Sequence, residues 1–378
     1  MKKMFLGVYS IFLVCLAIFS YAFVDPNLLF LRKLYTGLYA TNRPFVTLAF
    51  IFLVLIFFGF YTLFLYWFRQ KVFGNNEFKF ILISTVVFLF LAYPAMVSYD
   101  IFNYVATAKA LFFYHENPYI IMPIQFLHDP LLLFMQAANK TALYGPFWIF
   151  LTGIPYLSGF GNFAVTLFAF KLFNTIFYLA SIALLYKMSK NIYYLSFFAF
   201  NPLVIFETLV SSHNDIVMMF FAILTIYFLK NKKLILSIIL IILSILIKYS
   251  TVFLLPVILY AMFYQLRNKK LEWEKIFLWF SISMLVIFLL SQIREEIYPW
   301  YAIWFLIFLP FIRNKLIKYI YLSFSFGLLF RYVPFMLLGT YFGTTPLIKN
   351  FMTFIPVGVT ILFLALKKFI WQKSSNRF

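Results

Sequence analysis

The sequence predicts an all-α fold: a single domain, residues 1–378, formed by a polytopic bundle of about 12 transmembrane helices. Hydrophobic residues make up 65% of the chain, and charged residues make up only 11%, whereas a soluble domain carries about 25%. Apolar runs of about 20 residues, long enough to cross a hydrocarbon core of about 30 Å as a helix, recur along the whole chain. No polar stretch is long enough to form a separate soluble domain.

The apolar runs predict the individual spans in chain order. They lie at about 4–24, 45–68, 78–98, 163–186, 192–208, 214–229, 234–248, 250–265, 276–292, 299–312, 316–334 and 349–366. The runs at 234–248 and 250–265 are short, which favours tilted or broken helices beside a polar cavity. The apolar stretch 142–160 is interrupted by glycines and prolines, so it is predicted to be interfacial or re-entrant.

Basic residues predict the orientation of the chain. The formal net charge is +20, and the basic residues form short clusters between apolar runs, as in loops that face an anionic inner leaflet. This distribution does not favour a nucleic-acid partner. With both termini in the cytoplasm, about two thirds of the basic residues fall in inner loops, and counting 142–160 as a full span would reverse this bias. We therefore expect an integral protein of the plasma membrane, surrounded by lipids. Lys171 falls inside a predicted span, where a charge is costly.

The longest predicted outer loop, about 99–145, begins with the string SYDIFNY. Asp100 directly follows a span, and Tyr104 lies one helical turn later, which predicts an interfacial helix with Asp100 at its N-terminus. Asp100 is either a helix cap or a carboxylate available for chemistry. Asn117 and Tyr119 flank a proline in a pattern typical of a turn, which has a purely structural interpretation as well.

A second polar group lies in the string NPLVIFETLVSSHNDIVM and contains Glu207, His213, Asn214 and Asp215. In the predicted topology these residues face the same side as Asp100. Ionisable groups at membrane depth are costly and usually line a cavity or a pathway. The alternative is that Asp215 caps the next helix while Glu207 reaches water. The His-x-Asp spacing could also hold a divalent cation, Mg²⁺ or Mn²⁺, through Asp215 and His213, although two ligands indicate no definite metal site.

Three basic residues are candidates for binding an anion. Lys248 lies at the outer end of a short span, where it needs a carboxylate, a carbonyl or a lipid phosphate as a partner unless it only snorkels to the interface. Arg294 begins an outer loop, and Arg331 lies at the outer end of a later span. Trp300 lies in the string PWYAIWF, which fits either an aromatic belt at the interface or a platform on which a sugar stacks.

Taken in order, these strings resemble the GT-C superfamily of membrane glycosyltransferases, which take a sugar from a polyprenyl phosphate. The strings are SYDIFNY, ENPY, YGP, NPL…E…HND, IKYS…LLP and PWYAIWF, and they cover residues 95–310. They look most similar to the prokaryotic polyprenyl-phosphomannose-dependent mannosyltransferases, and the GPI mannosyltransferases are more distant. The chain departs from the pattern at Tyr298, where a histidine is common, at Lys171, where arginine is more common, and in the lone acid Asp100.

The resemblance implies an inverting transfer of a sugar, expected to be mannose, from a polyprenyl-phosphate donor to a lipid-linked, glycan or protein acceptor on the non-cytoplasmic face. Such a transfer needs one carboxylate base, which we assign to Asp100. Basic side chains stabilise the departing phosphate, and we assign Lys248 to this role with Arg331 and Arg294 as helpers. The residues expected to bind the sugar or the acceptor are Glu207, His213, Asn214, Asp215, Tyr104, Asn117, Tyr119, Tyr144 and Trp300.

Two other classes of function stay open at this point. A transporter or flippase for a lipid-linked saccharide would place ionisable residues near the bilayer midplane, usually in both halves of a repeat, whereas most acids here lie at predicted outer ends. A scaffold without chemistry would leave the one-sided group of acids unexplained.

Overall fold

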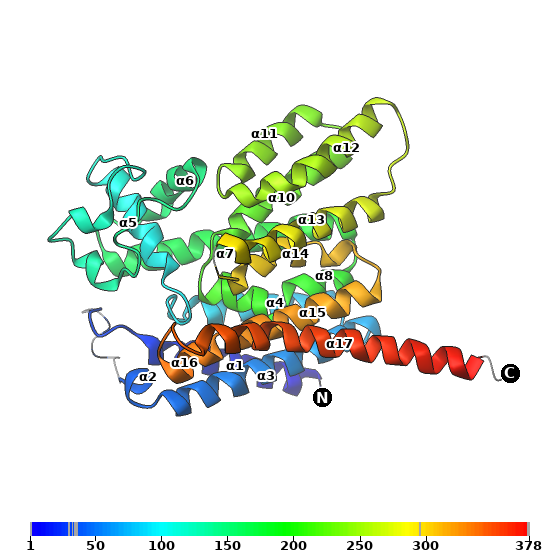
Figure 1. Ribbon diagram of the computed structural model, residues 1–378, viewed down its shortest axis with the longest axis horizontal. Coiled ribbons are helices and arrows are strands. Elements are labelled where there is room, and N and C mark those ends of the chain that lie inside the picture. The colour runs from blue at the N-terminus through cyan, green and yellow to red at the C-terminus, as the bar shows by residue number, and fades with distance from the viewer. Residues whose placement is uncertain (1, 29–30, 32, 34–36, 295, 376–378) are drawn as a thin grey trace.

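The chain is described by a computed structural model that covers residues 2–28, 31, 33, 37–294 and 296–375. Over these residues the secondary structure consists of helices without strands, which confirms the predicted all-α fold class. Figure 1 shows the long helices α1, α3, α15 and α17 lying roughly parallel along the longest dimension, with α5 and α6 at one end of the molecule. Helices α10, α11 and α12 form a second layer on the far side of α13 from α17.

Within the described residues, seven helical segments are long and apolar enough to cross a membrane, so the chain is an integral membrane protein. They are α1 with η1 (Lys2–Ser20 and Tyr21–Phe23), α3 (Arg43–Arg69), α7 (Phe163–Ser189), η6 with α12 (Tyr249–Leu254 and Leu255–Leu266), α13 (Trp273–Arg294), α15 with α16 (Lys315–Phe330 and Val333–Leu338) and α17 (Thr345–Ser375). An eighth would be a segment bent by 56°, which joins α8 (Ile192–Ala199) to α9 (Pro202–Ile205) and η5 (Phe206–Val210).

The count of about 12 spans is not confirmed, because several predicted spans form shorter helices. These are α4 (Asn75–Phe90), α10 (Asp215–Lys230), α11 (Leu234–Ile245) and the series η7 (Pro299–Ala302), α14 (Ile303–Leu306) and η8 (Leu309–Phe311). Helices α4 and α10 have 16 residues each, and at 1.5 Å per residue such a helix is only about 24 Å long. They can cross a 30 Å core only with the help of flanking residues or local thinning of the bilayer.

The remaining short helices lie in the predicted outer segments. They are α2 (Leu38–Thr41), α5 (Asp100–Phe112), η3 (Pro123–Gln125), η4 (Pro130–Phe134) and α6 (Pro146–Leu157). Helix α6 has 12 residues, or about 18 Å, so the stretch 142–160 does not form a full span by itself. Its interfacial position stays a prediction.

The turn at Gly145 fixes the start of α6 against the end of α11. The Gly145 amide donates to the Ile247 carbonyl at 3.0 Å, and the Phe147 amide donates to the Leu246 carbonyl at 2.9 Å. A Cβ atom on residue 145 would lie 2.2 Å from the Leu246 oxygen, so only glycine allows this approach. The contact brings Tyr144 next to the segment that carries Lys248.

Lys171 has a structural role that its position in the sequence did not reveal. Its side chain is fully buried in α7, and Nζ donates to the Leu89 carbonyl at 2.7 Å and to the Ala92 carbonyl. These carbonyls lie at the C-terminal end of α4, where a helix lacks internal donors and favours positive charge. Lys171 therefore caps a neighbouring helix from within its own span.

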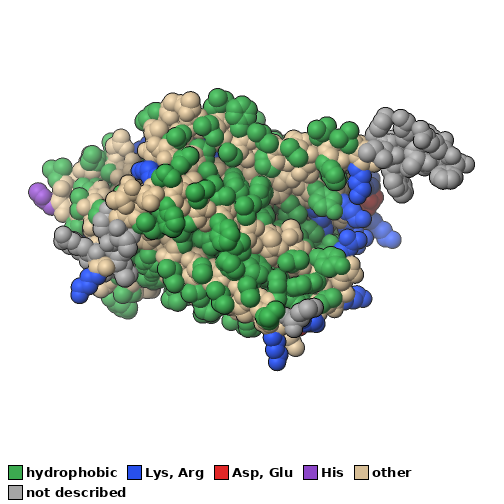
Figure 2. Space-filling model, turned by 90° about the horizontal axis from the view of Figure 1, so that it is seen from below, with side chains coloured by type: hydrophobic (Ala, Val, Ile, Leu, Met, Phe, Trp, Pro, Cys, Tyr) green, Lys and Arg blue, Asp and Glu red, His purple; other side chains and the backbone are tan. Residues whose placement is uncertain are grey.

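Basic side chains are concentrated toward one end of the molecule. Figure 2 shows most of the visible Lys and Arg side chains near the end at which α17 finishes. At the inner end expected from the sequence, Lys2 Nζ donates to the Val72 carbonyl at 2.5 Å, which joins the N-terminus to the turn between α3 and α4. This separation agrees with the predicted distribution of charge, and the orientation in the membrane stays a prediction.

Candidate active site

A buried polar loop connects η5 to α10 and carries His213 and Asn214. The loop turns at Ser212, whose φ of 59° is left-handed. Asn174 of α7 holds this turn, since its Nδ2 donates to the Ser212 carbonyl at 2.6 Å and to the Ser212 hydroxyl at 2.9 Å. Asp215 then begins α10, where the helix dipole favours a negative charge.

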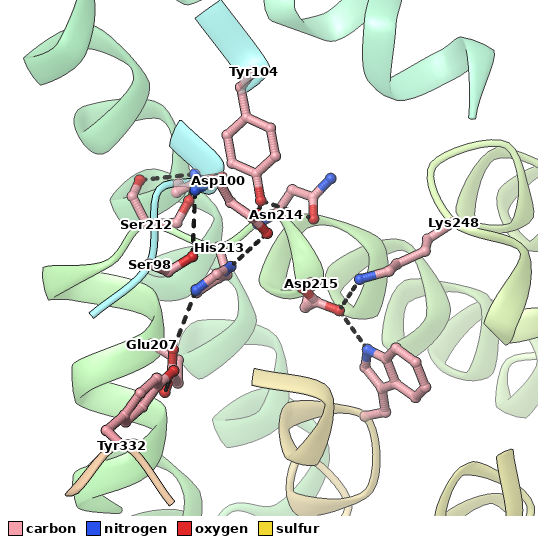
Figure 3. A network of polar contacts seen from close by, with 12 residues as sticks. Ser98, Asp100, Tyr104, Glu207, Ser212, His213, Asn214, Asp215, Lys248 and Tyr332 are labelled. Atoms are coloured by element: carbon pink, nitrogen blue, oxygen red, sulfur yellow. Dashed lines mark hydrogen bonds and ion pairs between the residues drawn. The ribbon is translucent and has the colours of Figure 1, made fainter. Parts of the chain in front are cut away.

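His213 lies between two carboxylates (Figure 3). Its Nδ1 is 3.5 Å from Asp100 Oδ2, and its Nε2 is 3.3 Å from Glu207 Oε2. The Tyr332 hydroxyl donates to the other Glu207 oxygen at 2.9 Å. The Trp300 ring stacks on the imidazole with 4.0 Å between ring centroids. Side chains from three chain segments therefore hold this imidazole in one orientation, and Tyr332 from a fourth segment holds Glu207.

The charge of His213 follows from these neighbours. Burial by itself would lower its pKa, but the Asp100 and Glu207 carboxylates outweigh burial and raise the pKa of His213 to about 9. Each ring nitrogen lies within 3.5 Å of a carboxylate oxygen, so the two carboxylates favour the protonated imidazole through hydrogen bonding and through charge. At neutral pH His213 is an imidazolium ion that holds two carboxylates together.

Asp215 points away from His213 toward a cation and an indole. Its Oδ1 accepts from Trp304 Nε1 at 2.6 Å and from Lys248 Nζ at 3.0 Å; Figure 3 shows Asp215 facing Lys248. Lys248 Nζ also lies over the Tyr301 ring, 4.2 Å from its centroid. Asp215 Oδ2 is buried and accepts from no described group. The ammonium group is thus fixed by a carboxylate and by aromatic faces.

The tyrosines assigned from the sequence connect the outer segment to this loop. The Tyr104 hydroxyl donates to Asn214 Oδ1 at 3.3 Å and accepts from the Asn214 amide at 3.3 Å. The Tyr104 and Tyr144 rings meet at 5.0 Å, and the Tyr119 hydroxyl donates to the Tyr144 carbonyl at 2.7 Å. The Asn117 side chain accepts from the Tyr119 backbone amide at 3.0 Å, as in a turn.

Exposure separates the charged residues of this network into two groups. The side chains of Glu207, His213 and Asp215 are fully buried. The Asp100 side chain is 28% exposed, and the Lys248 side chain is 20% exposed. Asp100 and Lys248 are therefore the carboxylate and the cation of this network that a substrate can reach. The buried loop connects them, because His213 contacts Asp100 and Asp215, two residues later, binds Lys248.

Arg331 lies in a second charged cluster instead of beside Lys248. Its Nη2 donates to Glu296 Oε1 at 2.9 Å, and Lys349 Nζ donates to the same oxygen at 2.8 Å. Tyr332, the next residue after Arg331, reaches Glu207, so the two clusters are neighbours. Arg294 ends α13, and its side chain lies outside the described part of the chain.

Sequence reasoning did not assign Tyr332, Glu296 or Lys349 to a site, and it considered Trp304 only as part of the aromatic string PWYAIWF. Trp304 follows Trp300 at helical spacing, which could have indicated a shared face. Lys349 begins an apolar run, the same signal that singled out Lys248. Tyr332 had no comparable signal, because its partner lies more than 100 residues away in the chain.

The structure gives no support to a cation held by Asp215 and His213. Both nitrogens of His213 face other residues, Asp100 and Glu207, while Asp215 faces Lys248. Across the part of the chain that the structure describes, no group of three His, Cys, Asp or Glu side chains is placed to hold a metal ion.

Comparison with known proteins identifies the family. Residues 4–264 match a family model described as MptA_B family, alpha-(1->6)-mannopyranosyltransferase, N-terminal domain. The match covers most of the chain and includes Asp100, the loop at 211–214 and Lys248, whereas Trp300 and Arg331 lie beyond it. No curated protein and no solved structure matches. The family confirms the resemblance to the membrane mannosyltransferases and supports mannosyl transfer by a glycosyltransferase. This chain belongs to the MptA_B family.

Proposed function

We propose that the protein transfers mannose, with inversion, from a polyprenyl-phosphate donor to a hydroxyl group of a lipid-linked, glycan or protein acceptor on the non-cytoplasmic face of the plasma membrane. One observation carries the proposal: Asp100, at the N-terminus of α5, is the accessible carboxylate of a network whose other acids are fully buried. Its orientation is fixed by His213, and an accessible cation, Lys248, belongs to the same network. The family match favours this reaction over the transport alternative.

In the proposed reaction, Asp100 accepts the proton of the acceptor hydroxyl while the acceptor oxygen bonds to the anomeric carbon. The bond between that carbon and the phosphate oxygen breaks in the same step. The polyprenyl phosphate leaves with the bonding electron pair, and Lys248 stabilises its negative charge. The proton on Asp100 is then released to water or to the departing phosphate. No proton donor is needed, since phosphate is a good leaving group.

The other residues of the network would position these two groups. Glu207 and Trp300 hold the His213 imidazolium, which orients the Asp100 carboxylate. Asp215 holds Lys248, and Trp304 holds Asp215 through its indole N–H. Tyr104, Tyr144 and Trp300 would contact sugar rings, and Arg331 and Arg294 stay predicted helpers for the phosphate. A single displacement inverts the anomeric centre, so an α-(1→6) product, the linkage in the family description, requires a β-linked donor.

The test is an Asp100→Asn variant in lipid nanodiscs, assayed with radiolabelled polyprenyl-phosphate mannose and an oligomannoside acceptor. We expect transfer to fall about 10²- to 10⁴-fold, the range for loss of a general base. The matched control is Glu116→Gln, which neutralises an exposed carboxylate of the same outer segment and should transfer normally. Near-normal transfer by a folded Asp100→Asn variant would refute the base assignment.

A further inference from the structure

Two buried cations share one oxygen atom outside the network around His213. Arg331, at the end of α15, and Lys349, in the first turns of α17, both donate to Glu296 Oε1, at 2.9 and 2.8 Å. The Arg331 side chain is 4% exposed, whereas the Glu296 side chain is 35% exposed. We call Arg331 and Lys349 the cationic pair. From this geometry we propose that the cationic pair binds the phosphate of a membrane lipid, and that Glu296 is the anion which this phosphate displaces.

The charge balance of the cluster favours an anion stronger than a single carboxylate. The other described partners of Arg331 are neutral: Nη1 donates to Asn350 Oδ1 at 2.9 Å and to Thr353 Oγ1 at 3.1 Å. Among the described residues, two positive charges therefore face one negative charge, and a buried charge without a counter-ion is strongly unfavourable. A phosphate ester brings one or two negative charges and several terminal oxygens, so each cation would have an oxygen of its own.

Of the three charged side chains Arg331, Lys349 and Glu296, Glu296 is the one that an incoming phosphate can displace. Both cations project from helices that pack against each other, α15 and α17. Glu296 lies in the connection between α13 and η7 and is the more exposed partner. Lys349 Nζ also lies 5.0 Å from the centroid of the Tyr341 ring, which keeps the ammonium in place independently of Glu296. The pair is thus a preformed site covered by a side chain from a connecting segment.

The same segment connects the cationic pair to the network around His213. Glu296 precedes Trp300, which stacks on the His213 imidazole at 4.0 Å. Arg331 precedes Tyr332, whose hydroxyl binds Glu207 at 2.9 Å. A phosphate bound by the cationic pair would therefore lie beside the residues that orient Asp100. A prenyl phosphate and a phospholipid headgroup share this chemistry. Only the choice of the prenyl phosphate as the ligand rests on the proposed function.

The experiment measures binding without transfer. Purified protein in phosphatidylcholine nanodiscs is titrated with radiolabelled farnesyl phosphate, with unlabelled farnesol as the competitor that lacks phosphate. We expect Arg331→Gln and Lys349→Gln to weaken binding and Glu296→Gln to tighten it about tenfold, because one charge-assisted hydrogen-bond acceptor no longer competes. The matched control is Asp129→Asn, which neutralises the carboxylate that accepts from Lys109 at 2.8 Å in the outer segment and should leave binding unchanged.

The Glu296→Gln variant distinguishes a displaceable anion from a purely structural salt bridge. If Glu296 only held α17 in place, its replacement would weaken the binding of farnesyl phosphate or leave it unchanged. If Glu296→Gln weakens binding or leaves it unchanged, the proposal is wrong, even where Arg331→Gln fails to fold. If farnesyl phosphate binding depends on Lys248 alone, the proposed function survives and this inference does not. If Glu296→Gln instead tightens the retention of phosphatidylglycerol, measured by native mass spectrometry, the site is confirmed and its lipid is a phospholipid.

Discussion

Replacing Gly145 by alanine tests whether the turn before α6 sets the geometry of the site. The added Cβ would lie 2.2 Å from the Leu246 oxygen and 2.6 Å from its carbonyl carbon. Ordinary contact between such atoms begins at about 3.4 Å, so the turn must move by about 1 Å. That movement disrupts the hydrogen bonds to Ile247 and Leu246, and it displaces Tyr144, which packs against Tyr104.

The expected effect is larger on transfer than on folding. A misplacement of about 1 Å in a positioning element can reduce a rate about 100-fold, whereas two weakened backbone hydrogen bonds cost about 1–3 kcal/mol of stability. The assay is mannosyl transfer in nanodiscs, with the thermal unfolding temperature of each variant measured in parallel. Gly59→Ala is the control, because nothing lies within 4 Å of a Cβ at that position. Gly145→Ala with the wild-type rate of transfer would refute the reasoning.

Two further predictions concern the buried basic side chains of His213 and Lys171. The pKa of His213, raised from 6.5 to about 9 by its two carboxylates, means that its ion pairs stabilise the fold fully below about pH 6.5 and not at all above about pH 9. The thermal unfolding temperature should therefore fall between pH 7 and pH 9.5 by a larger amount in the wild type than in His213→Gln, and equal slopes would contradict this charge state. Lys171→Met should lower the free energy of unfolding by about 1–3 kcal/mol, because the carbonyls of Leu89 and Ala92 lose their donor. Lys171→Arg should retain most of this stability in the same denaturation series, and a Lys171→Met variant as stable as the wild type would exclude the capping role.

The candidate site was predictable from the sequence in part. The polar strings around Asp100 and His213 stand out because acids and histidines are rare in such an apolar chain. The topology derived from basic residues placed both strings on one side, and the structure brings them within 3.5 Å. The roles of the individual residues stay predictions. Arg331, the predicted helper of Lys248 for the phosphate, contacts Glu296 in a second cluster, which the sequence did not indicate.

The sequence could not predict which groups the charged side chains contact, and the reason is physical. An ion pair depends on which helix faces pack together, and helices far apart in the sequence meet through packing that periodicity does not encode. Lys171 illustrates this limit: its partners are the backbone carbonyls of Leu89 and Ala92, in and just after the last turn of α4, which no side-chain pattern marks. Exposure is likewise a property of the assembled bundle, and it alone separates Asp100 from Glu207 and Asp215.

The amino-acid sequence by itself determined that the chain is a helical membrane protein and that it resembles the mannosyltransferases of the GT-C class. Composition suffices for the first conclusion, because a backbone in lipid must satisfy its hydrogen bonds internally, and helices do so locally. The tertiary structure decided which acid lies beside which base, which of them a substrate can reach, and that Arg331 and Lys349 share Glu296. These pairings depend on distances of a few ångströms between helices, and only the packed fold sets those distances.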